Sequence, residues 1–408
     1  MEIGVIFHFG TNTFLDREWG DGTAPPSTFN PADVDAEQWI RAVKAAGAKY
    51  VILVAKHHDG FCLWPSELTD YSVKSSPWKA GKGDLVREVA EAARKYGLKF
   101  GVYLSPWDRH DPRYKDQEAY DEYYLGQLDE LASNYGELVE FWMDGAGSSG
   151  HTYDFDKIVR ELRMWQPNTM VFADTALYKY GDLRWVGNEA GRLTYENWNV
   201  VDRAGYLRWR PVEADTPLRK LHWFWHPNDE ASLKSLDELI EDYDLTAGRG
   251  AQMMLGIAPD KIGRVSDADV ARLKEFGDAI QKRYNNNLVK KASLTQNQSL
   301  DGNPDTFWSA PEGSHQSEIQ VRFNEPVTID TALTMEWLNE GQNVEKYAIE
   351  VMDDAGKWKR VAEGQAIGHK KIDHFAPVTT KQVRLNLLWT TGPAHIREFQ
   401  LYSASGTR

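Results

Sequence analysis

The sequence has a single cysteine, Cys62, and lacks both a long apolar run and an excess of basic residues. One cysteine allows no disulfide within the chain, which fits a reducing compartment without excluding a secreted bacterial protein. The longest apolar runs are short segments such as 50–55, well below the roughly 20 residues of a membrane-spanning helix. The 408 residues include 47 basic and 61 acidic side chains, a net charge of -14. That balance argues against binding nucleic acid or an anionic membrane surface.

The start of the chain shows no recognisable secretion signal, because Met1 and Glu2 lead directly into an apolar, strand-like segment. The compartment is therefore open: periplasmic or secreted if an upstream signal has been removed, and cytoplasmic otherwise. The oligomeric state is equally open. Hydrophobic residues make up 41% of the chain, which is enough to bury a sizeable core.

Tryptophan is abundant, with 16 residues beside 18 tyrosines, and 12 of the 16 precede residue 286. The flat apolar face and the single N–H donor of tryptophan suit a sugar ring, although a large aromatic core would use the same residues. Many of them stand in or beside the ends of predicted strands, namely Trp19, Trp64, Trp107, Trp142, Trp185, Trp223 and Trp225. These positions favour a sugar-facing pocket over a general aromatic core.

Residues 1–285 alternate short apolar runs with amphipathic stretches. Strands are predicted at 3–9, 50–55, 99–104, 138–143, 170–173, 184–186, 221–225 and 252–257, with helices between most of them. This alternation predicts an α/β domain with a parallel sheet, and eight strands indicate a (β/α)8 TIM-like barrel. An open doubly wound sheet is the competitor, but no G-x-G-x-x-G motif follows the first strand.

The pattern changes after the three asparagines at 285–287, where helical periodicity ends. Short alternating segments follow at 318–323, 348–352, 358–362, 382–388 and 396–402. Strands at this spacing, joined by turn-rich loops, predict a separate all-β domain over 286–408, an antiparallel sandwich.

The active site of such a barrel lies at the carboxyl ends of its strands. Polar or ionisable groups beside aromatic residues follow six of the predicted strands, at His8 with Glu18 and Trp19, 56–59, 105–108, Asp144, Asn188 with Glu189, and His226. One such coincidence would mean little. Six of them at the same rim predict a polar pocket with aromatic walls.

Two carboxylates stand out in this set, Asp144 in Trp142-Met143-Asp144-Gly145 and Glu189 in Gly187-Asn188-Glu189. Alone, Asp144 would suit a helix cap or turn and Glu189 a surface loop. The barrel prediction places both at one rim, and paired carboxylates are the equipment of glycoside hydrolysis.

The adjacent pair His57 and His58 raises the alternative of a metal site. Neighbouring side chains on an extended strand point to opposite faces, so a single metal ion does not readily take both. A zinc site also needs a third ligand, and no H-x-H or H-E-x-x-H spacing is present. Hydrogen bonding to sugar hydroxyls is the better supported role for these histidines.

The same segments resemble the α-L-fucosidases of glycoside hydrolase family 29. The matching motifs occur in family order and cover nearly the whole barrel: 8–14, 18–20, 55–84, 103–110, 141–147 and 184–191. The most specific is the run from Ala55 to Asp84. The pattern is that of the subgroup acting on α-1,3/1,4-linked fucose, as in Lewis-type glycans.

The resemblance implies a retaining exo-hydrolase of fucosylated oligosaccharides or glycoconjugates, with no cofactor for catalysis. Asp144 matches the nucleophile of the family, and Glu189 looks like the acid/base. A proton donor must keep its proton near neutral pH, which a partly buried aromatic pocket can promote. The residues implied to bind or border the sugar are His8, Glu18, Trp19, His57, His58, Trp64, Tyr103 and Trp223.

The identity of the acid/base is open at this point, because Glu213 also lies in a segment that looks family-like and is an alternative acid/base or outer-subsite residue. Two stretches depart from the family pattern. Met254-Leu255-Gly256 stands where the family usually has Leu-Leu-Asn, and residues 215–222 stray from the subgroup. Both departures bear on linkage preference rather than on reaction class.

The C-terminal region resembles the coagulation-factor 5/8 type C (discoidin-like) domain, a galactose-binding-like jelly roll. The motifs are 300–308 and 397–402. In such domains this loop often binds one calcium ion through oxygen ligands, here Asp301, Thr306 and Glu398. A purely structural turn is the alternative.

Three other functions are alternatives to the fucosidase. A catalytically silent sugar-binding protein would lack one of the two carboxylates, and both are present. A metal-dependent barrel hydrolase would lose activity on chelation. A related exo-glycosidase acting on an α-L-galactoside would differ from a fucosidase only in the pocket size available to the substituent at C6.

Overall fold

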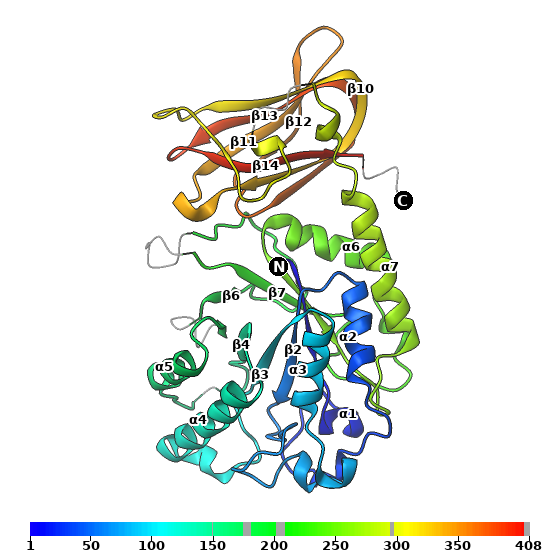
Figure 1. The fold of residues 1–408 in the computed structure, drawn as a ribbon, viewed down its shortest axis with the longest axis vertical. Helices are drawn as coiled ribbons and strands as arrows, with labels where there is room; N and C mark the ends of the chain where they lie inside the picture. The colour runs from blue at the N-terminus through cyan, green and yellow to red at the C-terminus, as the bar shows by residue number, and fades with distance from the viewer. Residues whose placement is uncertain (149, 174–180, 201–208, 294–297, 404–408) are drawn as a thin grey trace. The chain divides into compact units, whose positions relative to one another are not determined.

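The structure is a computed structural model that describes residues 1–148, 150–173, 181–200, 209–293 and 298–403 (Figure 1). The chain divides into two compact units. The barrel unit comprises 1–191, 213–239 and 252–276, and the sheet unit comprises 192–212, 240–251 and 277–408. Among the described residues, no helix combines the length and the apolar character needed to cross a bilayer.

Eight strands of the barrel unit pair in chain order and close into a barrel (Figure 1). They are β1 Ile3–Phe7, β2 Tyr50–Lys56, β3 Lys99–Leu104, β4 Glu140–Met143, β5 Met170–Ala173, β6 Leu183–Trp185, β7 Val212–Pro217 and β8 Gln252–Ile257. Neighbouring strands from β1 to β6 pair in parallel, as do β7 and β8, and β1 pairs with both β2 and β8, which closes the ring. The predicted barrel is confirmed.

The seventh strand was predicted at 221–225 and this is wrong, because β7 lies at Val212–Pro217. Residues 221–225 form turns instead, and Leu221 has a φ of 68°. All six residues of β7 are buried. The strand was missed because it carries acidic side chains at 213 and 215 in place of the apolar residues expected of a buried strand.

The helices lie between the strands in sequence: α1 Thr11–Leu15, α2 Ala36–Ala45, α3 Leu85–Lys95, α4 Gln117–Asn134, α5 Phe155–Trp165, α6 Leu236–Leu245 and α7 Asp267–Tyr284. Four of them begin at an aspartate whose side chain accepts a backbone N–H of the first turn, at Asp35, Asp84, Asp116 and Asp154. Such caps satisfy donors that the helix itself leaves unpaired.

The sheet unit contains one antiparallel sheet in the order β12-β11-β13-β10-β14-β9. Its strands are β9 Trp308–Ser309, β10 Ser317–Glu336, β11 Val344–Met352, β12 Trp358–Gly364, β13 Lys371–Thr390 and β14 His395–Tyr402. The long strands β10 and β13 pair with two register shifts, which increase local twist and bend. All five predicted segments of this region fall within these strands.

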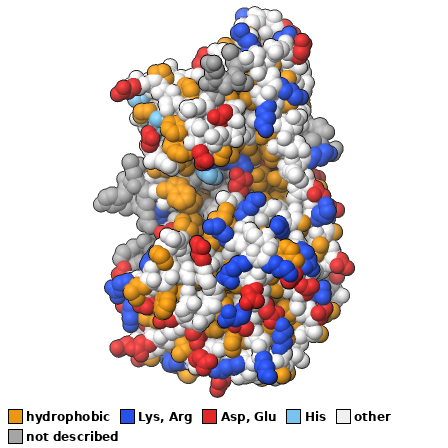
Figure 2. Space-filling model, in the orientation of Figure 1, with side chains coloured by type: hydrophobic (Ala, Val, Ile, Leu, Met, Phe, Trp, Pro, Cys, Tyr) orange, Lys and Arg blue, Asp and Glu red, His pale blue; other side chains and the backbone are white. Residues whose placement is uncertain are grey.

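The core of the sheet unit follows the alternation seen in the sequence. In the first half of β10, Ile319, Val321 and Phe323 are buried, while the residues between them are exposed. One buried apolar cluster then collects side chains from four of the strands, including Ile349, Leu385 and Phe399. On the face of the molecule shown in Figure 2, acidic and basic side chains are interspersed.

Candidate active site

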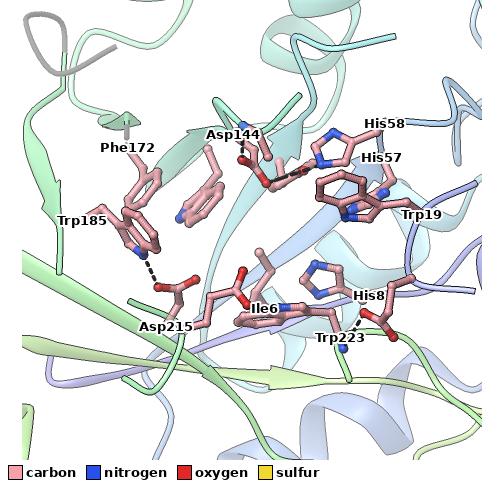
Figure 3. Close-up of a pocket in the computed structure, with 15 residues that line it drawn as sticks. Ile6, His8, Trp19, His57, His58, Asp144, Phe172, Trp185, Asp215 and Trp223 are labelled. Atoms are coloured by element: carbon pink, nitrogen blue, oxygen red, sulfur yellow. Dashed lines mark hydrogen bonds and ion pairs between the residues drawn. The ribbon is translucent and has the colours of Figure 1, made fainter. Parts of the chain in front are cut away.

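A cavity opens at the carboxyl ends of the barrel strands and lies entirely within the barrel unit (Figure 3). Nine of the residues singled out from the sequence line it together: His8, Glu18, Trp19, His57, His58, Tyr103, Asp144, Glu189 and Trp223. The remaining lining residues are Ile6, Trp142, Ala146, Phe172, Trp185 and Asp215. The rim of the barrel thus forms one polar pocket with aromatic walls.

Asp144 follows β4 and is held by two donors. The Tyr103 hydroxyl donates to Oδ2 at 3.0 Å, and the backbone N–H of Ala146 donates to Oδ1 at 2.8 Å. Burial raises the pKa of Asp144 above its usual value, and these two hydrogen bonds offset part of the rise. The carboxylate is therefore oriented through both of its oxygens, which suits a nucleophile that must attack one carbon atom.

His58 faces Asp144, with Nε2 3.7 Å from Oδ2. The hydroxyl of Ser105 donates to the carbonyl of Trp107, so His58 Nδ1, 2.7 Å from Ser105 Oγ, must be the donor in that contact. Burial and the nearby cations Arg109 and Lys56 lower the pKa of His58 to about 3. The neutral ring then keeps its proton on Nδ1, and Nε2 is an acceptor suited to a hydroxyl group.

His8 and His57 are neutral for the same reason. Burial lowers the pKa of His8 to about 3 and that of His57 well below its usual range, and the neighbouring His58 adds to both shifts. His57 stacks on Tyr103 with ring centroids 5.9 Å apart. A pocket of neutral imidazoles can exchange hydrogen bonds with an uncharged polyol, and it has no cationic attraction for an anion.

A buried cluster fixes the end of β2, from which His57 and His58 project. The Lys56 ammonium contacts Asp108 at 3.1 Å, the hydroxyl of Tyr120 at 3.2 Å and the amide oxygen of Gln127 at 2.8 Å. Gln127 in turn donates to the sulfur of Cys62 at 3.2 Å. Cys62 is fully buried, and burial raises the pKa of its thiol well above the usual range.

Glu18 fixes one wall rather than reaching into the cavity with a free carboxylate. Its oxygens accept the backbone N–H groups of Trp223 at 2.9 Å and Phe224 at 3.3 Å, and a nitrogen of His226 lies 2.6 Å away. Trp223 packs over His8 with ring centroids 5.1 Å apart. The carboxylate thus pins the segment after β7 that carries the Trp223 wall.

Gly256 on β8 makes room for the same indole. A Cβ built on Gly256 would lie 2.6 Å from Cζ3 of Trp223 and 3.2 Å from Cα of Pro217, closer than non-bonded carbon atoms pack. Gly256 and Pro217 belong to the two stretches that depart from the family pattern, 254–256 and 215–222. These two stretches are therefore in contact with each other. The observed position of the Trp223 ring therefore requires glycine at position 256.

Two of the predicted site residues do not line the cavity. Trp64 is buried, and its indole N–H donates to Glu130 of α4 at 2.7 Å. Glu213 is fully buried inside the barrel, where it accepts from Tyr50 at 2.9 Å and from the Trp142 indole at 2.8 Å. Burial raises the pKa of Glu213, and the pKa of its neighbour Glu140 rises as well.

The sequence reasoning missed Asp215 and Phe172 in the lining of the pocket, whereas Trp142 and Trp185 were among the tryptophans expected at strand ends. Trp142 and Phe172 stack with ring centroids 3.7 Å apart. Asp215 points into the cavity beside Trp185, whose indole N–H donates to it at 2.5 Å (Figure 3). A signal was present, because residues 213 and 215 are two apart and share one face of any strand that contains them.

The calcium ligands expected in the sheet unit are all oxygen donors, which fits a hard cation. The Thr306 hydroxyl donates to Asp301 Oδ2 at 2.8 Å, and Asp301 Oδ1 accepts the N–H of Asn303 at 2.7 Å. Glu398 Oε1 is buried and has no hydrogen-bond partner. Within the described residues, no group of three or more His, Cys, Asp or Glu side chains is arranged to hold a metal ion.

Comparisons with known proteins agree on one family. Residues 3–285 match the alpha-L-fucosidase family, and residues 283–399 match the F5/8 type C domain family. Alpha-L-fucosidase 1 of Arabidopsis thaliana is 37% identical to the chain over 410 residues, covering 92% of this chain and 80% of the relative.

Solved structures give the same result. A GH29 fucosidase of Ruminococcus gnavus in complex with fucose superposes with a TM-score of 0.89 at 30% identity, covering 98% of this chain and 92% of that one. A glycoside hydrolase 29 family member from an unknown rumen bacterium has a TM-score of 0.86 at 35% identity, covering 99% and 75%. The chain belongs to the alpha-L-fucosidases of glycoside hydrolase family 29, with a C-terminal F5/8 type C domain.

Proposed function

We propose that the protein is a retaining exo-glycosidase that releases terminal α-L-fucose, α-1,3/1,4-linked as in Lewis-type glycans, through a covalent fucosyl-enzyme intermediate. The observation that carries the proposal is the shared cavity of two carboxyl groups, Asp144 after β4 and Glu189 after β6. Neutral histidines and tryptophans surround them, which suits an uncharged sugar with one apolar edge. The family membership sets the reaction class, and the cavity supports this division of roles.

In the first step Asp144 attacks the anomeric carbon and forms an ester, the glycosidic C–O bond breaks, and Glu189 donates its proton to the leaving oxygen. In the second step Glu189 takes a proton from water, the water oxygen attacks the same carbon, and the ester bond to Asp144 breaks. The Tyr103 hydroxyl and the Ala146 N–H hold the carboxylate of Asp144 during the attack. Retention predicts carboxyl groups about 5–5.5 Å apart.

Glu189 rather than Glu213 is assigned as the acid/base. Glu189 lines the cavity and is exposed at its rim, where a leaving group departs and water enters. Glu213 is enclosed by Tyr50, Trp142 and the β7 backbone, so an incoming water has no direct access to it. This placement favours a structural role for Glu213 beneath the floor of the pocket.

The test is a substrate screen with proton nuclear magnetic resonance of the first product. The wild-type enzyme is given p-nitrophenyl α-L-fucoside, Lewis-type trisaccharides and the matching α-L-galactoside. We expect fucose release from the first two, with the α-anomer formed first. Failure to release fucose from both fucosylated substrates, preferential hydrolysis of the galactoside, or initial formation of the β-anomer would contradict the proposal.

A Glu189→Gln variant tests the acid/base directly. It should lose activity on the trisaccharides by roughly 10²–10⁴-fold, the usual contribution of general acid–base catalysis. An aryl fucoside with a good leaving group needs little protonation and should be affected far less in the first step. Equal loss on both substrates, or wild-type activity on both, would move the role to another residue, with Glu213→Gln as the matched comparison.

We further propose that the sheet unit binds one calcium ion through Asp301, Thr306 and Glu398. The supporting observation is the buried, unpartnered oxygen of Glu398 close to the Asp301 loop. Calcium should raise the melting temperature of the wild type and not that of an Asp301→Ala variant, with magnesium as the control ion. Equal melting curves with calcium and with EDTA would remove the proposal.

A further inference from the structure

The active-site cavity is lined by a fourth carboxyl group, Asp215, beside those of Glu18, Asp144 and Glu189, and the roles proposed above leave it unused. It lies on β7 and is 6% exposed. Its side chain points into the cavity, between the rings of Trp185 and Trp223 in the view of Figure 3. One oxygen accepts the Trp185 indole N–H at 2.5 Å. A buried carboxyl group with so little hydration needs a reason to be there.

The surroundings of Asp215 favour its neutral form. Burial, with a smaller contribution from the acidic groups Glu213 and Glu189, raises the pKa of Asp215 to about 8, although the Trp185 hydrogen bond opposes the rise. Its partner on the neighbouring strand β8 is Met254, which carries no charge. At neutral pH Asp215 therefore keeps its proton and adds no second negative charge beside Glu189.

The loop that carries Glu189 is tied to β7 at both ends. It leaves β6 at Trp185, and the next residue, Val186, donates its N–H to the Glu213 carbonyl at 2.9 Å. At the far end Gly191 has a φ of +64°, and a Cβ there would lie 2.6 Å from Cβ of Thr216. The Trp185–Asp215 hydrogen bond is the side-chain tie at the first of these ends.

We propose that Asp215 is a positioning residue for the acid/base Glu189: by holding the Trp185 indole, it fixes both a wall of the sugar pocket and the start of the Glu189 loop. The proposal rests on the function proposed above. Asp215 forms no bond to the substrate in this role and exchanges no proton during the cycle. It sets the geometry within which Glu189 does so.

The experiment compares Asp215→Asn, Asp215→Ala and Trp185→Phe. Asparagine can still accept the indole N–H and resembles the protonated carboxyl group, so at pH 6 this variant should retain kcat/KM within a few-fold of wild type. Alanine and phenylalanine each break the tie. We expect both to lose roughly 10²-fold in kcat/KM on a Lewis-type trisaccharide, the cost of misplacing a catalytic group by about 1 Å.

Two readouts separate positioning from a merely structural role. On an aryl fucoside that needs little protonation, Asp215→Ala should lose far less than on the trisaccharide. The alkaline limb of the wild-type pH profile should change in Asp215→Asn, because only the wild type gains a negative charge as the pH rises through about 8. Equal losses on both substrates, or an Asp215→Asn variant as impaired as alanine at pH 6, would overturn the proposal.

A double variant distinguishes a failure of the positioning proposal from a failure of the proposed function on which it rests. If Asp215 acts through Glu189, adding Asp215→Ala to Glu189→Gln should cost little more on the trisaccharide than Glu189→Gln alone. Fully additive losses would overturn the positioning role and leave Glu189 as the acid/base. A Glu189→Gln variant with wild-type activity would instead contradict the acid/base assignment itself.

Discussion

Asp215 in the barrel unit and Glu336 in the sheet unit are both almost completely buried carboxyl groups, yet their partners differ. Glu336 receives three backbone N–H groups, from Asn343 at 2.6 Å, Val344 at 3.1 Å and Gly368 at 3.2 Å. Asp215 receives one side-chain donor and faces a cavity. Burial raises the pKa of Glu336 to about 7 and that of Asp215 to about 8.

The difference shows that burial and a raised pKa do not by themselves mark a functional carboxyl group. Both carboxylate oxygens of Glu336 accept backbone N–H groups, and these belong to two different loops, which the side chain joins. Its acceptor positions are therefore already occupied by the protein rather than offered to a ligand. Asp144 and Asp215 keep access to a cavity. Glu336 also borders a cavity, so it is the number of backbone donors around a buried carboxyl group that separates the structural case from the catalytic one.

The largest expected effect tests this distinction at Asp144. Asp144→Ala removes the nucleophile and should lower fucose release by at least about 10³-fold, as the loss of a covalent catalyst commonly does. The melting temperature should stay near that of wild type, because the side chain borders the cavity and is 24% exposed. Retained turnover in a correctly folded variant, measured with p-nitrophenyl α-L-fucoside, would place the nucleophile elsewhere.

The next effect concerns the wall of the cavity that the Trp223 indole forms. Gly256→Ala introduces a methyl group 2.6 Å from the Trp223 ring and should lower kcat/KM by roughly 10–100-fold through displacement of the indole. Gly10→Ala is the control, because a Cβ there meets no atom within 4 Å.

A Trp223→Leu background sharpens the same test. Without the indole there is no ring to displace, so Gly256→Ala should then cost little more than Trp223→Leu alone. If the two losses simply add, the methyl group acts through Pro217 or β8 rather than through Trp223.

A smaller effect is expected for Glu336→Gln in the sheet unit. The amide keeps one acceptor oxygen but turns an N–H donor toward backbone N–H groups, which should cost about 1–3 kcal/mol of folding free energy. Turnover at 25 °C should stay near wild type in the fraction that is folded. Chemical denaturation followed beside activity checks both, and a loss of turnover without a loss of stability would erase the distinction between the two carboxyl groups.

The last expected effect is on stability rather than on turnover, and it takes the form of a pH dependence. The pKa of Asp215 is higher in the folded chain than in the unfolded one, so this group favours unfolding increasingly as the pH rises from about 4 to about 8. Asp215→Asn removes that contribution, and its melting temperature should gain on wild type more at pH 8 than at pH 5. Parallel melting temperatures across this range would mean that Asp215 ionises normally.

Most of the barrel could be predicted because its strands and helices follow the local rules of apolar periodicity and aspartate caps. β7 could not, because Glu213 and Asp215 are stabilised by hydrogen bonds from Tyr50, Trp142 and Trp185, which lie on other strands. Local sequence shows two acidic residues beside a proline and indicates a loop. The aromatic run at 221–225 looked like the better strand, yet it supplies the Trp223 wall from a turn.

The candidate site was predictable where a polar residue follows directly on a predicted strand, as Asp144 and His58 do, because the carboxyl ends of barrel strands form the active site. Trp64 lies in an equally suggestive motif, but Glu130 of α4 binds its indole N–H away from the cavity, and no local pattern shows that pairing. Gly256 was noted as a departure, while its contact with Trp223 required the register of β8 against the segment after β7.

The buried thiol of Cys62 can report how often the barrel unit opens. Alkylating reagents attack the thiolate, and this sulfur is shielded while the packing between β2 and α4 is intact. Because it is the sole cysteine, each molecule takes up one adduct at most, and the sheet unit contributes none. Intact mass after timed exposure to iodoacetamide would therefore count openings of the barrel alone, whatever the sheet unit does.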